Sequence, residues 1–93
     1  MKNIFTGDEL VEYARTINSK EEFEHFLKCL IQDYKENKNE WENADLSLYL
    51  DGLAKFTVDM SGYYSNLNED INVNDITWRI VAEMLLAASV YGN

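Results

Sequence analysis

Asp59 and Tyr63 are the residues whose types and spacing come nearest to acid–base chemistry. Residues four positions apart on a helix lie on the same face, so their carboxylate and phenol would be neighbours. A pocket that raised the carboxyl pKa would let the pair act as general acid and base. More often, such an aspartate accepts a hydrogen bond from a tyrosine hydroxyl, an indole N–H or a backbone amide. We therefore predict a structural or binding role for the pair and no catalytic residue.

A run of asparagine and aspartate residues resembles a calcium loop in its spacing. Side-chain oxygens alternate at Asn66, Asn68, Asp70, Asn72 and Asn74. An EF-hand loop needs glycine at its sixth position and a bidentate glutamate at its twelfth. Ile71 and Thr77 hold these positions here. A solvated loop over residues 65–74 is therefore expected.

The single histidine and the single cysteine, His25 and Cys29, lie one helical turn apart. Two ligands are half of a tetrahedral zinc site, and the chain has no other histidine or cysteine to complete it. Cys29 also has no histidine base on its inward side, so nothing activates the thiol. We expect both to be ordinary surface or boundary residues, and we predict no metal and no cofactor.

Charge and composition exclude several classes of partner. Seventeen acidic residues against eight basic ones give a formal net charge of −9. Such a chain is repelled by phosphates, so binding to nucleic acid or to an anionic membrane is not expected. A basic protein partner would be attracted, although an acidic surface also serves solubility alone. The lone cysteine, the absence of an apolar leader and the lack of a run of about 20 apolar residues predict a cytoplasmic protein.

The spacing of apolar residues predicts an all-α fold, with one domain over residues 1–93 in which residues 1–5 are loosely ordered. A compact bundle of about four helices is expected, at roughly 7–17, 20–37, 44–61 and 76–91. Capping-box patterns at Thr6–Glu9 and Ser19–Glu22 mark the first two helix starts. The second helix has the most regular inward stripe, made by Phe23, Phe26, Leu27, Leu30, Ile31 and Tyr34.

The third helix is expected to begin after Asn43 as its N-cap. It ends either at Gly62, which takes a left-handed conformation without strain, or one turn later, after Tyr63 and Tyr64. The residues of its inward stripe are Leu46, Tyr49, Leu50, Leu53, Thr57 and Met60. Trp41, in the preceding link, is too large to leave in water, and we expect its ring to lie over the helix ends.

The stretch from Asp75 to Tyr91 is apolar on nearly every side. A helix of this kind lies at the centre of a bundle or is shared with a partner chain. The stripes of the other helices are just enough to cover it, so we expect a monomer or a weak homodimer. Asp75 and Arg79 form a favourable pair at i, i+4 spacing. If this face is buried between chains, Trp78 and Arg79 are candidate anchors.

Several short motifs show a family likeness over about residues 17–91. W-E-N-x-D-L begins at Trp41, D-M-x-G-Y-Y runs from Asp59 to Tyr64, and W-R-x-x-A-E-x-L-x-A-A-x-x-Y begins at Trp78. In these motifs the chain resembles a family of small acidic bacterial proteins classed as a domain of unknown function. That family often has Asn-Pro at the entry to its last helix, where this chain has Asn74-Asp75-Ile76. The resemblance implies a shared fold and supplies no activity.

Three classes of function remain open. The first is a non-enzymatic protein-interaction module, for instance an inhibitor or immunity-type protein whose acidic face neutralises a basic partner. The second is a homo-oligomeric structural protein that uses the apolar C-terminal helix, and the third is an enzyme that uses Asp59, Tyr63 or Glu83. The candidate residues for an interaction or structural motif are Trp41, Asp59, Tyr63, Tyr64, Trp78 and Arg79.

Overall fold

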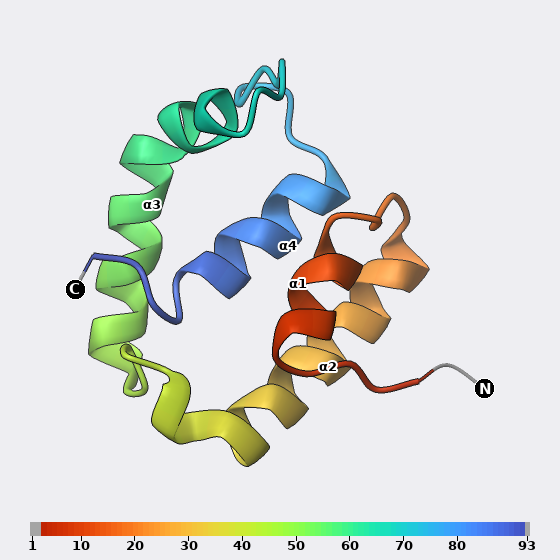
Figure 1. The fold of residues 1–93 in the computed structure, drawn as a ribbon, viewed down its shortest axis with the longest axis vertical. Helices are drawn as coiled ribbons and strands as arrows, with labels where there is room; N and C mark the ends of the chain where they lie inside the picture. The colour runs from red at the N-terminus through yellow and green to blue at the C-terminus, as the bar shows by residue number, and fades with distance from the viewer. Residues whose placement is uncertain (1–2, 93) are drawn as a thin grey trace.

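The computed structural model describes residues 3–92 and contains four α-helices and one short 3-10 helix. The helices are α1 (Asp8–Ala14), α2 (Lys20–Asn37), η1 (Lys38–Glu40), α3 (Leu46–Asn66) and α4 (Trp78–Ala87) (Figure 1). No strand occurs within the described residues, and the predicted all-α class is confirmed. No helix in this range has the length and apolar character needed to cross a membrane.

Helix α4 lies at the centre, as predicted (Figure 1). It contacts α1, α2 and α3, whereas α3 contacts no other helix than α4 among the described elements. The core accordingly has two parts. Ala82 of α4 joins a cluster with α1 and α2 residues such as Leu10 and Phe26, and Ile80 joins Phe56 and Tyr64 of α3. The C-terminal helix therefore connects an α1–α2 pair to a separate α3.

Helix α1 is shorter than the expected 7–17, and its start differs from the prediction. Its N-cap is Gly7, with φ at +59°, and no side chain caps the helix, so the expected Thr6 capping box is wrong. The amide of Gly7 instead donates to Oδ1 of Asp33 on α2, at 2.8 Å. The start of α1 is thus held by a carboxylate from α2, at a different amide from the one that Thr6 was expected to bind.

Helix α2 has the predicted bounds, and its capping residue is also the predicted one. Ser19 Oγ accepts from the amide of Glu22 at 3.1 Å, and Oε1 of Glu22 accepts from the amide of Asn18 at 2.9 Å. Its inward face is rotated from the expected stripe, because Leu27 and Ile31 are exposed. The expectation that these two side chains face the core was wrong.

Besides Phe26 and Leu30, α2 buries a row made by His25, Cys29 and Asp33, so the placement of His25 and Cys29 at the surface or its boundary was wrong. This row holds the extended segment before α1. His25 Nε2 bonds to the carbonyl of Asn3, and the amide of Phe5 donates to Sγ of Cys29 at 3.4 Å. Residues 3–5 belong to the stretch expected to be loosely ordered, and residues 1–2 of that stretch lie outside the described residues.

Helix α3 begins and ends later than the expected 44–61. Asp45 is its N-cap and accepts from the amide of Leu48 at 2.8 Å, so Asn43 was the wrong cap. The helix continues through Gly62 to Asn66 because nothing at Gly62 requires a left-handed backbone. That conformation comes after the helix end, at Asn68, where φ is +59°.

The inward face of α3 also differs from the prediction. The buried residues of α3 are Gly52, Phe56, Met60 and Tyr64. Of the expected stripe, Met60 is buried, Tyr49 and Leu53 are half-buried, and Leu46, Leu50 and Thr57 are exposed. The reason is that only α4 packs on this helix, so one narrow face is covered.

Helix α4 is shorter than the expected 76–91. Thr77 caps it by accepting from the amide of Ile80 at 3.1 Å, and it ends at Ala87. Residues 88–91 form turns instead of a further helical turn. These turns are held by Asn43, as described below.

Candidate functional site

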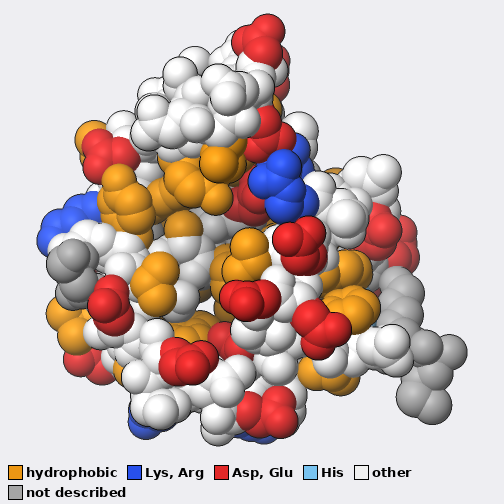
Figure 2. Space-filling model, in the orientation of Figure 1, with side chains coloured by type: hydrophobic (Ala, Val, Ile, Leu, Met, Phe, Trp, Pro, Cys, Tyr) orange, Lys and Arg blue, Asp and Glu red, His pale blue; other side chains and the backbone are white. Residues whose placement is uncertain are grey.

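A cleft of about 410 Å³ lies between α1 and α3, beside α4. It exists because α3 meets α4 alone and leaves space on the side toward α1. One wall includes Val11 and Ala14 of α1, the opposite wall includes Phe56 and Tyr63 of α3, and residues 86–91 lie between them. Figure 2 shows a hollow on this face, with hydrophobic side chains inside it and acidic side chains around it.

Four carboxylate residues line the cleft: Asp8, Asp33, Glu40 and Glu83. No lysine or arginine among the described residues belongs to this lining. Asp8 and Glu40 are exposed, whereas Asp33 and Glu83 are buried and hydrogen-bonded. An apolar hollow with the exposed carboxylates of Asp8 and Glu40 at its edge favours a ligand that is apolar and carries positive charge.

Asp33 is the most connected of these carboxylates. Besides Gly7, it accepts from the indole Nε1 of Trp41 at 2.8 Å and from Nδ2 of Asn37 at 3.0 Å. Burial acts to raise its pKa, but the donated hydrogen bonds outweigh burial and hold the pKa below its usual value. The carboxylate therefore joins α1, α2 and the following link. Nothing in the sequence singles out Asp33 beyond its position within residues 17–91, where the family likeness lies.

Trp41 lies where the sequence placed it, in the link over the helix ends. Its ring is half-buried and stacks on Tyr49 of α3, with centroids 5.8 Å apart and an interplanar angle of 14°. The edge contact with Tyr34 of α2 has a centroid distance of 5.1 Å. Burial raises the pKa of Tyr49 to about 12, and its hydroxyl donates to the carbonyl of Leu85 at 2.6 Å.

Asn43, from the W-E-N-x-D-L motif that begins at Trp41, holds residues 88–91 in place. Its Nδ2 donates to the carbonyls of Ala88 and Tyr91, both at 2.9 Å. Its backbone amide donates to the carbonyl of Ser89, also at 2.9 Å. A side chain that we expected to cap α3 thus holds residues 88–91 as one wall of the cleft.

The structure does not bring Asp59 and Tyr63 together as an acid–base pair. Oδ2 of Asp59 accepts from the hydroxyl of Tyr91 at 2.7 Å, at an exposed position outside the cleft lining. Tyr63 lines the cleft and packs edge-on against Phe56, with ring centroids 5.3 Å apart. The hydrogen bond to Asp59 raises the pKa of the Tyr91 hydroxyl.

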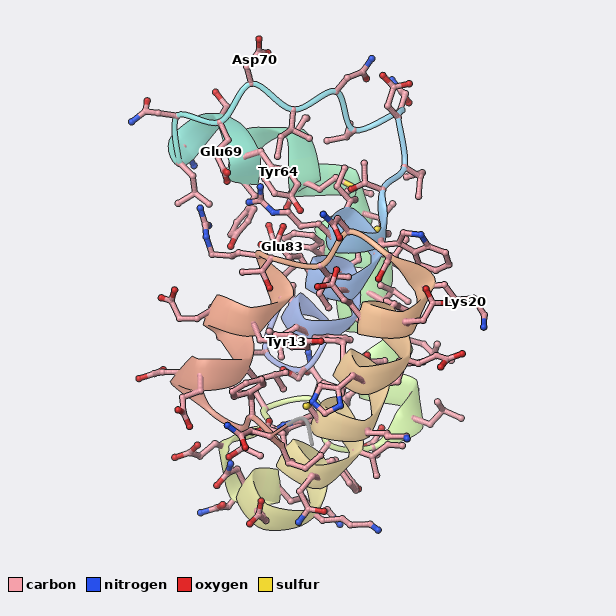
Figure 3. All side chains as sticks on the ribbon, turned by 90° about the vertical axis from the view of Figure 1, so that its right-hand side faces the viewer. Tyr13, Lys20, Tyr64, Glu69, Asp70 and Glu83 are labelled. Atoms are coloured by element: carbon pink, nitrogen blue, oxygen red, sulfur yellow. The ribbon has the colours of Figure 1, made fainter. Side chains whose placement is uncertain are left out.

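Arg79 and Tyr64 meet in a charged cluster beside the cleft. The hydroxyl of Tyr64 donates to Oε1 of buried Glu83 at 2.8 Å, and Arg79 Nε donates to the same oxygen at 3.0 Å. Arg79 Nη2 also contacts both carboxylate oxygens of Glu69, at 2.9 and 2.8 Å. In Figure 3 Tyr64, Glu69 and Glu83 lie close together near the start of α4.

The predicted partner of Arg79 was wrong. Arg79 pairs with Glu69 and Glu83, and no ion pair with Asp75 occurs in the described chain. Burial and the hydrogen bond to Glu83 together raise the pKa of Tyr64 well above its usual value. Trp78, the remaining candidate, is partly exposed and packs on Phe23 of α2 at a centroid distance of 5.3 Å.

Within residues 3–92 no group of three or more histidine, cysteine, aspartate or glutamate side chains is placed to hold a metal ion. The six candidate residues instead fall at separate points around α4. Trp41 and Tyr63 border the cleft, Tyr64 and Arg79 belong to the charged cluster, and Asp59 and Trp78 lie elsewhere on the surface.

Residues 19–92 match the model of a family described as of unknown function, DUF7660. The chain belongs to this family. No curated protein and no solved structure gives a significant match. The residues that match DUF7660 include α2, α3 and α4. Helix α1, which forms one wall of the cleft, precedes the matched residues.

Proposed function

We propose that this DUF7660 member is a non-enzymatic protein-interaction module that binds a basic partner at the cleft. An inhibitor or immunity-type protein is the kind of module that fits. The observation that carries the proposal is an apolar cleft that, within residues 3–92, is lined by four acidic residues and by no lysine or arginine.

The size and chemistry of the cleft support this proposal. Its volume, about 410 Å³, is within the usual range of binding sites, and Val11 and Val90 are partly exposed at it. Lysine and arginine have long apolar stems with charged ends, so a basic segment places its stems against these residues and its charges beside Asp8 and Glu40. The net charge of −9 adds long-range attraction, which accelerates association at low salt.

The hydrogen bonding of the buried carboxylates supports the non-enzymatic interpretation. Asp33 accepts three hydrogen bonds, and Glu83 accepts from Tyr64 and Arg79. A general acid or base needs a free proton site in reach of a substrate. Because the Asp33 and Glu83 carboxylates already accept hydrogen bonds from the protein, their role is to hold the walls of the cleft in place.

A titration with two matched peptides tests the proposal. The probe is a helical leucine–lysine peptide, and its control is a leucine–glutamate peptide of equal length and apolar content. We expect the lysine peptide alone to shift the amide NMR signals around Val11 and Val90, and the shifts to weaken with salt. Shifts spread evenly over the surface, or an equal response to both peptides, would contradict a basic-segment site.

Charge reversal supplies the matched variants. Asp8→Lys with Glu40→Lys changes the rim of the cleft, and Glu21→Lys with Glu36→Lys makes the same change in net charge on α2. The rim variant should lose at least about tenfold in affinity for the lysine peptide, or about 1.4 kcal/mol, and the α2 variant much less. Equal losses would mean that net charge alone attracts the peptide.

A further inference from the structure

The outer face of α3 has an exposed apolar row that no part of the described chain covers. Leu46, Leu50 and Val58 are 72%, 53% and 80% exposed, and they are spaced four or eight residues apart. Ala54 and Gly62 occupy the intervening and following positions of the same row and are also exposed. Residues four apart form a continuous ridge on a helix. The ridge is therefore long and apolar.

This face also carries little charge for an acidic chain. The 21 residues of α3 include only three charged ones, Asp51, Lys55 and Asp59. Asp51 and Lys55 neutralise each other, with Lys55 Nζ 2.8 Å from the Asp51 carboxylate. Asp59 is then the single unneutralised charge of α3, so a basic partner finds little attraction here, whereas a second apolar face meets little repulsion.

We propose that the ridge Leu46–Leu50–Ala54–Val58–Gly62 is the two-fold interface of a homodimer, in which α3 packs antiparallel on α3 of a second copy. The proposal does not rest on the function of the cleft. Tyr63, which lines the cleft, is nine residues from Ala54 and so about half a turn around the helix. Dimerisation on the ridge leaves the cleft open.

The sequence of the ridge is self-complementary about Ala54. In an antiparallel pair centred there, Leu50 comes opposite Val58 of the second copy, whereas Leu46 and Gly62 lie about 80° around the helix from Ala54 and border the contact. Large residues thus oppose smaller ones, and the smallest non-glycine side chain lies on the axis, where the two helices come closest. Lys55 comes beside Asp51 of the second copy, so each charge on the edge has an opposite neighbour. A two-fold interface requires this match of one face with itself.

The available length predicts a weak dimer. Helix α3 has 21 residues, which corresponds to about 30 Å at 1.5 Å per residue. One helix pair of this length and about 10–12 Å width covers roughly 600–700 Å² in total, below the about 1,000 Å² of a stable specific interface, so the dimer is weak. Because each copy has a net charge of −9, repulsion opposes association and salt should strengthen it. Binding of a basic partner has the opposite salt dependence.

Sedimentation equilibrium on the full chain tests the interface through complementary charges at Ala54. Ala54→Glu and Ala54→Lys each place two like charges opposite one another on the axis, and both residues are good helix formers. We expect wild-type chains to dimerise at high micromolar concentration and each variant to be at least about tenfold weaker. An equimolar mixture of the two variants should regain the dimer, because unlike charges then meet.

Leu48→Glu is the matched control, since Leu48 is a partly exposed leucine of the same helix that lies outside the ridge. It should dimerise like the wild type, and circular dichroism should show equal helix content in all variants. A wild-type chain that stays monomeric at about 1 mM in high salt overturns the proposal. Equal loss in Leu48→Glu, or failure of the mixed variants to associate, overturns the assigned face.

Discussion

A single carboxylate, Asp33, fixes three segments that border the cleft. It accepts from the amide of Gly7 at the start of α1, from Asn37 at the end of α2 and from the indole of Trp41. A buried acceptor with three donors is costly to change, because each donor then lacks its partner. The orientation of α1, and with it one wall of the cleft, depends on this residue.

Replacement of Asp33 by asparagine should lower the free energy of unfolding at neutral pH by about 1–3 kcal/mol, because an amide nitrogen would face an N–H donor. The pKa of Asp33 is lowered in the folded chain relative to about 3.9 in the unfolded one. Its contribution is therefore complete above about pH 4 and is lost as the pH falls through the folded pKa. The difference between wild type and variant should shrink accordingly in urea unfolding at low pH.

Asp70→Asn is the control for this comparison, because Asp70 is an exposed aspartate of the loop before α4. It should leave the free energy of unfolding within about 0.5 kcal/mol of the wild type at both pH values. A pH-independent effect of Asp33→Asn would contradict a role for its charge.

Adjacent tyrosines on α3 differ sharply in their surroundings. The hydroxyl of buried Tyr64 donates to Glu83, whereas no hydrogen bond from the Tyr63 hydroxyl is found among the described residues. Tyr64→Phe removes a hydrogen bond to a charged group and should cost about 1.5–3 kcal/mol in thermal or urea unfolding. Tyr63→Phe should change stability by less than about 0.5 kcal/mol. Similar losses for both variants would argue against the Tyr64–Glu83 bond as the cause.

At the scale of the elements, two glycines of α3 should respond in opposite directions to the same substitution. A Cβ at Gly62 meets nothing within 4 Å, so Gly62→Ala should stabilise the chain by about 0.5–1 kcal/mol through helix propensity. A Cβ at Gly52 would lie 2.6 Å from the carbonyl of Ala88 and from Nδ2 of Asn43. Gly52→Ala should therefore destabilise by about 1–3 kcal/mol through overpacking.

Denaturant midpoints of the two variants provide the measurement. Destabilisation by Gly62→Ala would mean that α3 ends near Gly62, as the sequence had suggested. If Gly52→Ala left the free energy of unfolding unchanged, residues 88–91 would not lie in close contact with α3 at Gly52.

The positions of the helices along the chain could be predicted from the sequence more completely than the face that each helix buries. The cap at Ser19 and the asparagine-rich end at Asn37 located α2 correctly. Periodicity fails to select a face when apolar residues surround a helix, and Leu46 and Leu50 misled the prediction for α3 in this way. Gly52 is buried because a backbone segment approaches it, and no local pattern in the sequence reveals such an approach.

The candidate site depends on contacts between distant segments, which is why the sequence did not reveal it. The cleft combines residues 7–14 with residues 86–91, and Asp33 acts across 26 positions to hold Gly7. Glu69 and Arg79 come from a loop and a helix start whose relation is set by tertiary packing. The sequence did indicate the net charge and several of the residues involved, such as Trp41, Tyr64 and Arg79.

At the scale of the whole molecule, excess negative charge should destabilise the folded chain at low salt. Seventeen acidic and eight basic residues share a compact chain, and self-repulsion is released when the chain unfolds and expands. From about 20 mM to about 200 mM NaCl the screening length falls from roughly 20 Å to roughly 7 Å. We expect the free energy of unfolding to rise by about 0.5–1 kcal/mol over this range, measured at low micromolar protein so that association is negligible.

The surface variant Glu21→Gln with Glu36→Gln separates repulsion from other effects of salt. It removes two exposed charges of α2, so it should be more stable than the wild type at low salt and should gain less on addition of NaCl. A fall in wild-type stability with salt would show instead that local attractions dominate, above all the pairs of Arg79 with Glu69 and Glu83. In that case repulsion among the acidic side chains would not lower the stability of the folded chain. Neutralisation of these charges by a basic partner would then not stabilise the complex.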